Sequence, residues 1–310
     1  MKKRNMVTKK PIMKTKTVIF LIVILIIAAI LGIYKFKRDF QIEQENPPKL
    51  YFYGENGKKI ELLPIEYSWE YKGETKTYKD EDFLNRDYSD METVYLDSAL
   101  GETGAYLQTE EKYKINSVYR NYYKFGGMNV GGGTVGFKEN DNTKIYADTS
   151  SSNAGSFLIR YDVNYKKQGY VSYVQKVTVL NRNNIKTASN YTNINLEEQE
   201  KITNLVKELE FKQILKSVKV ENKNLVIEYE YYPVEGILTS NNAILFACIN
   251  DLENIVYTAT NKKTFYTEKV ENQYQIVYDE NRENFIVNKV DFENSTNISL
   301  NDLKKYIEEV

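Results

Sequence analysis

Two acidic clusters are the residues whose types and spacing could do chemistry, namely Asp80-Glu-Asp82 and Asp279-Glu-Asn-Arg-Glu283. Glycosidases that act on polymers use two carboxylates at a defined separation, and acidic loops outside the cell often hold calcium. The calcium-loop pattern D-x-[DN]-x-[DN]-G does not occur in the sequence. With 43 acids among 310 residues, accidental clusters are expected. We interpret both clusters as solvated loops and predict no catalytic residue and no metal ligand.

Two features of the composition exclude most catalytic templates. The chain has no histidine, which removes the usual base of nucleophilic triads and the commonest transition-metal ligand. A single cysteine, Cys248, excludes an intramolecular disulfide and any multi-cysteine zinc or iron–sulfur site. The neighbours of Cys248 in segment 242–249 are mostly apolar, so we expect a buried, unreactive thiol rather than a nucleophile.

A glycine-rich stretch contains Gly131-x-Gly133-x-x-Gly136, which matches the dinucleotide-binding pattern in form. That pattern needs a buried strand before it, a helix after it and an acidic residue roughly 20 positions on. Here the stretch lies among strand signals and is followed by Phe137-Lys-Glu-Asn, without the Gly-Lys-Ser/Thr ending of a phosphate-binding loop. We predict a flexible or bulged connection and no bound cofactor.

The segment Thr17–Tyr34 reads TVIFLIVILIIAAILGIY and contains no charged residue. At 1.5 Å per residue it would form a helix of roughly 27 Å, which nearly spans a bilayer core. The alternative is a cleaved secretory signal, whose apolar region is usually shorter and ends in small residues spaced A-x-A. Here Ala28-Ala29 is followed by Ile30 and Leu31. We therefore predict an uncleaved transmembrane helix at 17–34.

Basic residues predict the orientation of this helix, because they stay on the cytoplasmic side of the first span. Residues 1–16 contain seven basic residues, whereas only Lys35, Lys37 and Arg38 follow closely. Residues 1–16 are thus expected in the cytoplasm and everything after about residue 39 outside the cell membrane. The first 38 residues carry ten of the 42 basic residues and none of the 43 acids, so the exported part is near −11. Such a charge disfavours nucleic acid as a partner.

The exported part is expected to begin with a stalk at 35–48 that ends in Pro47-Pro48, followed by a mostly antiparallel, β-sandwich-like domain at 47–182. A hairpin is predicted at 50–63, and further strands at 115–123, 144–146, 157–165 and 170–180. Ile65, Tyr67, Trp69 and Tyr71 alternate along another strand. A carbohydrate or peptide could stack on this aromatic row, but we favour a row that packs into the sheet core. Little can be predicted for 72–112.

A small α+β domain is predicted at 195–275, after an Asn- and Thr-rich linker at 181–195. Asn195 can cap a helix with Glu198, and Ile202, Leu205, Val206 and Leu209 form its apolar stripe. A hairpin at 218–231, a buried helix at 240–249 and a second hairpin from 254–260 and 264–268 complete the order α-β-β-α-β-β. The C-terminal extension, 276–310, is expected to end in a short helix at 299–308. The predicted fold class is α+β.

Residues 196–274 resemble a domain-of-unknown-function family of Gram-positive bacteria, number 4825. The resemblance lies in Leu225-Val-Ile-Glu-Tyr229, in Asn242-Ala-Ile-Leu-Phe-Ala-Cys-Ile249 and in Phe265-Tyr-Thr-Glu268. Cys248 stands where the family more often has leucine. The Pro47-Pro48 entry and Tyr67-Ser-Trp-Glu-Tyr71 are similar to extracytoplasmic modules that often precede such a domain. Some relatives are appended to membrane-embedded receptor metallopeptidases, which implies a sensing or ligand-binding role, although this sequence lacks their zinc-binding part.

These features predict a non-enzymatic, membrane-anchored protein of the cell envelope that binds a small ligand or an envelope protein. Its membrane partner would be the lipid bilayer, through residues 17–34. One alternative is an enzyme that acts on cell-wall polymer through paired carboxylates. Another is a helper subunit of a membrane complex, because Ala28-x-x-x-Gly32 has the small-residue spacing used in pairing of membrane helices.

Overall fold

The computed structural model describes residues 22–31, 43–54, 58–97, 105–147, 154–180, 182–233, 238–270, 273–279 and 283–309. The chain divides into two compact units, Met1–Glu43 and Gln44–Val310. In the first unit, residues 22–31 form a helix whose large apolar side chains are exposed. Over the described ranges, no helix is long and apolar enough to cross a membrane. The rest of the predicted anchor, and with it Gly32, lies outside the described residues.

The second unit is a β-rich α+β fold with mostly antiparallel sheets, as predicted. Its first sheet has four strands in the order β2-β1-β6-β9. They are β1 (Leu50–Tyr53), β2 (Lys59–Glu61), β6 (Tyr106–Thr109) and β9 (Lys144–Tyr146). The predicted hairpin is confirmed, because Phe52 pairs with Ile60 across β1 and β2. Leu50 and Phe52 are buried while Tyr51 and Tyr53 are half-buried, so alternation gives this sheet one core face.

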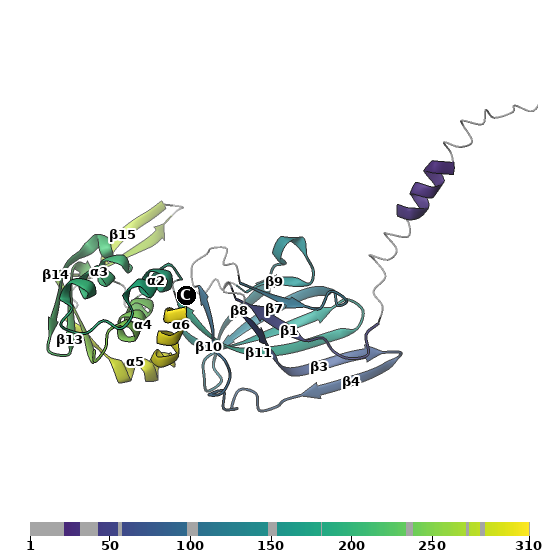
Figure 1. Ribbon diagram of the computed structural model, residues 1–310, viewed down its shortest axis with the longest axis horizontal. Coiled ribbons are helices and arrows are strands. Elements are labelled where there is room, and N and C mark those ends of the chain that lie inside the picture. The colour runs from purple at the N-terminus through teal and green to yellow at the C-terminus, as the bar shows by residue number, and fades with distance from the viewer. Residues whose placement is uncertain are drawn as a thin grey trace, which may run out of the picture. The chain divides into compact units, whose positions relative to one another are not determined.

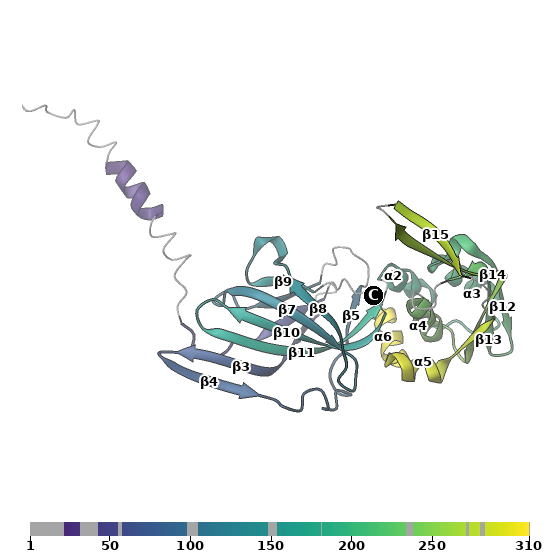
Figure 2. The same ribbon diagram turned by 180° about the vertical axis from the view of Figure 1, so that it is seen from behind.

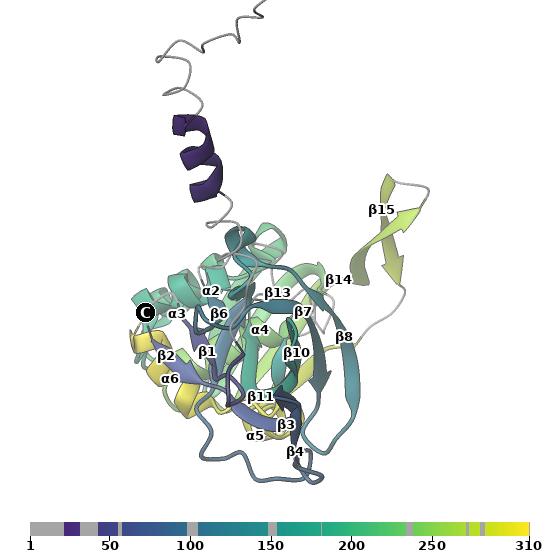
Figure 3. The same cartoon turned by 90° about the vertical axis from the view of Figure 1, so that its right-hand side faces the viewer.

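The second sheet has seven strands, with the order β4-β3-β11-β10-β7-β8 and with β5 parallel to β11. They are β3 (Leu63–Tyr71), β4 (Glu74–Lys79), β5 (Val94–Asp97), β7 (Ile115–Tyr123), β8 (Asn129–Val135), β10 (Gly155–Tyr165) and β11 (Gly169–Leu180). Figure 1 shows β10 and β11 as long neighbouring strands, and Figure 3 shows β8 at the margin of the sheet beside β7. The hairpin of β10 and β11 was predicted. Strands β4, β5 and β6 were not, because they lie in the charged, turn-rich stretch 72–112.

One core receives side chains from both sheets, among them Leu50 and Leu107 from the first and Tyr161 and Tyr173 from the second. Trp69 is fully buried in this core, and its indole N–H donates to the carbonyl of Gln44 at 2.9 Å. The core interpretation of the aromatic row is therefore confirmed for its largest member. A bulge near Ile65 shifts the register of β3, so Ile65 packs in a separate small cluster on the opposite face.

The third sheet has the order β12-β13-β14-β15, with β16 paired to β14. Its strands are β12 (Leu215–Glu221), β13 (Asn224–Tyr232), β14 (Asn254–Val270), β15 (Gln273–Asp279) and β16 (Phe285–Asn288). The hairpin predicted from 254–260 and 264–268 is wrong, since one strand runs through both segments. The interruption at Lys262 and Lys263 is a register shift against β13, not a turn. No glycine or proline lies there to reverse the chain.

Five helices accompany this sheet in the described part of the second unit: α2 (Arg182–Ala188), α3 (Gln199–Glu208), α4 (Leu238–Cys248), α5 (Lys289–Thr296) and α6 (Leu300–Glu309). Short 3-10 turns are η1 (Lys138–Asn140), η2 (Ser189–Tyr191) and η3 (Lys212–Ile214). Figure 2 shows α4, α5 and α6 grouped near β13. The buried helix and the terminal helix were predicted. The prediction of a linker at 181–195 is wrong, because helix α2 lies in this segment and contributes Ile185 and Ala188 to the core.

The predicted start of the helix at Asn195 is wrong by one turn. Helix α3 begins at Gln199 with Glu198 as its N-cap residue, although the Glu198 carboxylate does accept the N–H of Asn195 at 2.9 Å. The apolar stripe is confirmed, with Ile202, Leu205 and Val206 buried. The same core also includes residues from β11, α5 and α6. Because this core joins segments from both predicted domains, the boundaries predicted for them, 47–182 and 195–275, stay predictions.

Candidate functional site

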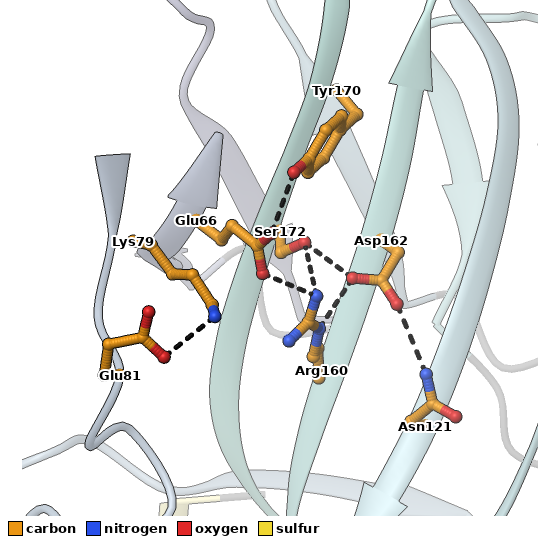
Figure 4. Close-up of polar contacts among 8 residues, drawn as sticks. All are labelled: Glu66, Lys79, Glu81, Asn121, Arg160, Asp162, Tyr170 and Ser172. Carbon is orange, nitrogen blue, oxygen red and sulfur yellow. Dashed lines mark hydrogen bonds and ion pairs between the residues drawn. The ribbon is translucent and has the colours of Figure 1, made fainter. Parts of the chain in front are cut away.

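A polar network on the face of the seven-stranded sheet that lies opposite Trp69 brings two carboxylates to one guanidinium (Figure 4). Arg160 donates from Nε to Asp162 at 2.6 Å and from Nη2 to Glu66 at 3.0 Å. Ser172 also donates to Asp162, at 2.6 Å, and Tyr170 donates to Glu66 at 2.8 Å. The network therefore joins strands β3, β10 and β11.

This arrangement is poorly suited to carboxylate catalysis. All four carboxylate oxygens accept a hydrogen bond, because Asn121 donates to the second oxygen of Asp162 at 3.3 Å. Burial would lower the pKa of Arg160, but its bonds to Asp162 and Glu66 outweigh this and raise it. Both carboxylates are thus bound to one permanent cation and to neighbouring side chains. The network is a structural tie between strands.

The two acidic clusters of the sequence do not form a catalytic or metal site among the described residues. Asp80 binds Arg86, with Nη2 of Arg86 2.6 Å from Oδ2 of Asp80, and it accepts the N–H of Asp82 at 3.2 Å. It thereby organises a turn. Residues 280–282 and the side chain of Asp279 lie outside the described residues. Cys248 is buried as predicted, and burial raises the pKa of its thiol to about 12.

The outer face of the four-stranded sheet carries tyrosines, but their ring faces are occupied. Tyr53 and Tyr106 stack with centroids 5.0 Å apart and planes 8° apart. The amine of Lys138 lies 5.0 Å from the centroid of Tyr106, and that of Lys59 lies 3.8 Å from the centroid of Tyr51. A sugar that binds by stacking needs a free ring face. These tyrosines instead stabilise cross-strand pairs.

A cavity of about 520 Å³ lies beside the margin of the seven-stranded sheet, next to β8. Most of the residues that line it come from three strands and two helices, and Lys124, Ala154 and Asn297 directly adjoin these elements. The lining residues are Arg120, Tyr122, Lys124, Val130, Gly131, Gly132, Gly133, Thr134, Ala154, Gly155, Ser156, Phe157, Thr239, Ser295, Thr296 and Asn297. Ligand pockets usually measure roughly 300–1,000 Å³, so the cavity is large enough for a small molecule. We take it as the candidate functional site.

Strand alternation directs Arg120 into this cavity. Val118, Arg120 and Tyr122 occupy alternate positions of β7 and are buried, on the face of the sheet that carries the core. The guanidinium carbon of Arg120 lies 5.5 Å from the ring centroid of Tyr122, which meets Phe157 edge-on at 6.3 Å. Arg120 is only 8% exposed. A cation is thus held in place beside an aromatic wall.

The glycine-rich stretch forms the opposite wall. It is a strand and not a connection, but the predicted bulge is present, as a register shift at Val130. It folds as strand β8, because Val135 and the three glycines pair in antiparallel register with β7. A dinucleotide motif would need a helix next, and η1 follows instead. Glycine is required at 132, where a Cβ would lie 2.6 Å from the carbonyl oxygen of Arg120. The missing side chains leave the space beside Arg120 open.

The sequence pointed to the glycines but not to the cavity. Arg120 carried a usable signal, since an arginine between Val118 and Tyr122 lies on the apolar face of its strand. The sequence could not predict that Ser295 and Thr296 line the cavity, because no sequence pattern places the end of α5 near β10. In the structure a Cβ on Gly155 would lie 3.8 Å from the carbonyl oxygen of Thr296.

Comparisons with known proteins give no family. No protein-family model matches the chain, and no curated protein matches it. Among solved structures, the crystal structure of CopC from Methylosinus trichosporium OB3b matches 28% of this chain and 83% of its own, with 14% identity and a TM-score of 0.22. This likeness is too distant to carry an argument about fold or function. The resemblance of 196–274 to family 4825 stays a prediction.

Proposed function

We propose that the chain is a non-enzymatic, single-pass membrane protein that displays a ligand-binding region outside the cell membrane. The β-rich part would be sandwich-like and the α+β part would complete the cavity. The observation that carries this proposal is the cavity beside β8, with a buried arginine in its wall. Small-molecule sites are concave pockets of this size in which a few polar groups orient the ligand.

The membrane location rests on the sequence from Thr17 to Tyr34 and on its basic N-terminal side. The described helical residues 22–31 support it, because their large apolar side chains are between 45% and 68% exposed. Such exposure is costly in water, at about 25 cal/mol per Å² of apolar surface, and costs nothing in lipid. Lipid would therefore be the stable environment for this helix.

Topology can be tested with single cysteines in a variant in which Cys248 is replaced by serine. Variants with a cysteine at Lys10 or at Ser117, an exposed position of β7, would be treated with a membrane-impermeant maleimide on intact cells. We expect Ser117→Cys to react and Lys10→Cys to react only after lysis. Equal protection of both positions would contradict the proposed location. Labelling after lysis serves as the control for accessibility.

Binding can be tested by a thermal-shift screen of small molecules with the full chain in detergent. A ligand that binds the folded state raises its melting temperature. Gly133→Leu is the variant that separates binding in the cavity from binding elsewhere. Gly133 faces Arg120 across the strand pair, and within the described part of the chain no heavy atom lies within 4 Å of a Cβ added at 133. Leucine there should fill the cavity without disturbing the sheet. We expect compounds that stabilise the native chain but not Gly133→Leu, and their absence would contradict the proposal.

A further inference from the structure

We propose that the outer edge of β8, the side away from β7, binds an extended peptide segment of a partner protein as an added strand, and that a side chain of this peptide enters the cavity. This inference rests on the proposed ligand-binding function and adds the class of ligand. Such a peptide gains affinity from backbone hydrogen bonds to β8 and specificity from the cavity. Neither contact depends on a charged group of the cavity.

Strand β8 lies at one end of the seven-stranded sheet and has backbone groups left for pairing (Figure 3). Within the described ranges it pairs with β7 alone, and alternate residues of an antiparallel strand direct their N–H and C=O groups away from the paired neighbour. A bulge at Val130 and the bond of 2.9 Å from the N–H of Gly131 to the side chain of Asn129 mark the start of this edge. Residues 132–135 are therefore the part of β8 that can accept another strand.

The sequence of β8 lacks the features that usually keep an exposed edge from pairing. Natural proteins place charged residues, especially lysine, or proline on their edge strands. The opposite edge of the same sheet, β4, carries Glu74, Lys76 and Lys79, and the edge strands β2 and β12 of the other sheets also carry charged residues. Strand β8 contains no charged residue and no proline. Its edge is thus open to a partner strand, whereas that of β4 is protected by its charges.

The three glycines of β8 have different reasons, and one of them points to an approaching peptide. Glycine inside a strand often marks a place where another backbone or a ligand approaches closely. At 132 that neighbour is β7, because an added Cβ would lie 2.6 Å from the carbonyl oxygen of Arg120. At 131 a φ of 152° favours glycine. At 133 no heavy atom of the described residues lies within 4 Å of an added Cβ, so β7 does not require glycine there. An added strand explains it.

Strand alternation places a side chain of the added strand in the cavity. Gly133 pairs with Arg120, and paired residues direct their side chains to the same face of the sheet. A peptide residue that pairs with Gly133 would therefore also face the cavity, in the space that glycine leaves unfilled. Val130, Ala154 and Phe157 give this space apolar walls, so we expect an apolar side chain at that position of the peptide.

A second copy of this chain fits the edge less well than a peptide with side chains does. A symmetric pair of β8 strands centred on Gly132 would bring glycines against glycines. Cross-strand pairs of side chains are the unit of stabilisation in a sheet, and glycine supplies none. Such a pair would also leave both cavities without an entering side chain. The edge therefore favours a partner strand of different sequence.

The test selects peptides of about ten residues, the upper length of most strands, from a displayed random library with the full chain in detergent as bait. The affinity of a selected peptide is measured by fluorescence anisotropy. Each residue of the peptide is then N-methylated in turn, which removes one backbone donor and keeps every side chain. Strand pairing predicts that N-methylation at alternate positions weakens binding at least about tenfold and that the positions between them tolerate it. Equal sensitivity along the peptide, no sensitivity, or no selected peptide would overturn the proposal.

Proline substitutions in β8 test the same pairing from the side of the protein. Adjacent residues direct their N–H groups to opposite edges, so one of Gly133→Pro and Thr134→Pro keeps the bonds to β7 and removes a donor from the outer edge. The variant that keeps the native melting temperature should bind the selected peptide at least about tenfold more weakly. Lys76→Pro and Thr77→Pro make the matched change in β4, and the folded one should bind like the native chain. Unchanged affinity in the folded β8 variant would contradict the proposal, and the N-methyl scan decides if both β8 variants unfold.

Gly133→Leu separates this inference from the proposed function. The selected peptide should bind it more weakly, because leucine fills the space that the peptide side chain would enter. If small molecules stabilise the native chain but not Gly133→Leu and no peptide binds, ligand binding stands and only the peptide class is wrong. If neither a peptide nor a small molecule distinguishes the two proteins, the proposed function fails as well. Self-association of the native chain that a folded β8 proline variant abolishes would identify a second copy as the partner and overturn the peptide class.

Discussion

Gly133 faces Arg120 across the antiparallel pair of β7 and β8, and no heavy atom of the described residues lies within 4 Å of the position that a Cβ at 133 would take. The neighbouring Gly132 is enclosed, because a Cβ there would lie 2.6 Å from the carbonyl oxygen of Arg120 and 2.8 Å from Oδ1 of Asn121. Two adjacent glycines therefore serve different purposes. One lets the strands approach, and the other leaves the cavity open.

This difference predicts opposite outcomes for alanine at the two positions. Gly132→Ala should destabilise the protein by about 1–3 kcal/mol, since the backbone must shift to relieve the contact. Gly133→Ala should change the stability by less than about 0.5 kcal/mol. Urea denaturation of both variants in detergent would measure the free energy of unfolding. Equal destabilisation by the two substitutions would show that β8 is not placed as described.

The Arg160 network predicts a stability effect rather than a functional one. Arg160→Met leaves Glu66 and Asp162 without their cation, and the three side chains are only 20%, 19% and 28% exposed. We expect a loss of about 2 kcal/mol, below the ~3–5 kcal/mol seen when fully buried pairs are broken. Lys79→Met is the matched control. It removes an exposed pair with Glu81 at 2.8 Å and should leave the free energy of unfolding nearly unchanged.

Denaturant unfolding of Arg160→Met and Lys79→Met tests this difference. If Arg160→Met proved as stable as Lys79→Met, the network would not be a tie between strands. A loss of ligand binding in a fully folded Arg160→Met would also contradict the account, because it would move the site to the opposite face of the sheet.

The hydrogen bonds of Asp141 predict that the stability of the fold depends on pH in the acid range. Burial raises its pKa, but the N–H and hydroxyl of Thr143, at 2.9 and 2.8 Å, and the amine of Lys144 outweigh this and lower it. A carboxyl whose folded-state pKa lies below its value in the unfolded chain stabilises the fold above about pH 4. That stabilisation is lost as the pH falls through the folded-state pKa.

Asp141→Asn removes the charge and keeps an oxygen that can accept the Thr143 bonds. We expect it to melt about 1–2 °C below the native chain at pH 7, and the difference to disappear as the pH falls through the lowered folded-state pKa of Asp141. Melting curves across this range would measure it. A difference that stays constant with pH would rule out the carboxylate as its cause.

We expect Cys248, the only thiol in the chain, to be protected from thiol reagents in the folded protein. Its pKa of about 12 leaves on the order of one thiolate in ten thousand at pH 8, and its side chain is buried. We expect a thiol-specific disulfide reagent to react only in denaturant. The rate of absorbance change with and without urea measures this. Fast reaction of the native protein would contradict the described packing of α4.

Much of the fold follows from short-range patterns. Strand segments with apolar residues at alternate positions, such as 159–165 of β10, and the apolar stripe of α3 were predicted because local sequence determines them. The errors have long-range causes. Arg182–Ala188 looks like a polar linker, yet Ile185 and Ala188 meet a core supplied by distant segments. Strand β14 is interrupted by lysines whose register shift depends on its partner β13.

The candidate site was less predictable than the fold. Its glycines were visible, and an arginine on the apolar face of β7 could have been noticed. The cavity itself depends on β8 leaving the margin of a sheet open beside helix ends that are more than 100 positions away in sequence. Only the tertiary structure brings Arg120 and Thr296 to one space. Cavities of this kind have no local sequence signature.

Isothermal titration of the full chain with the best compound from the thermal-shift screen tests the central claim most directly, because it measures whether ligand occupies the space beside Arg120. The native chain should bind one equivalent, Gly133→Ala should bind more weakly, and Gly133→Leu should not bind while it keeps the native melting temperature. Unchanged affinity in a folded Gly133→Leu would contradict the claim that this cavity is the functional site.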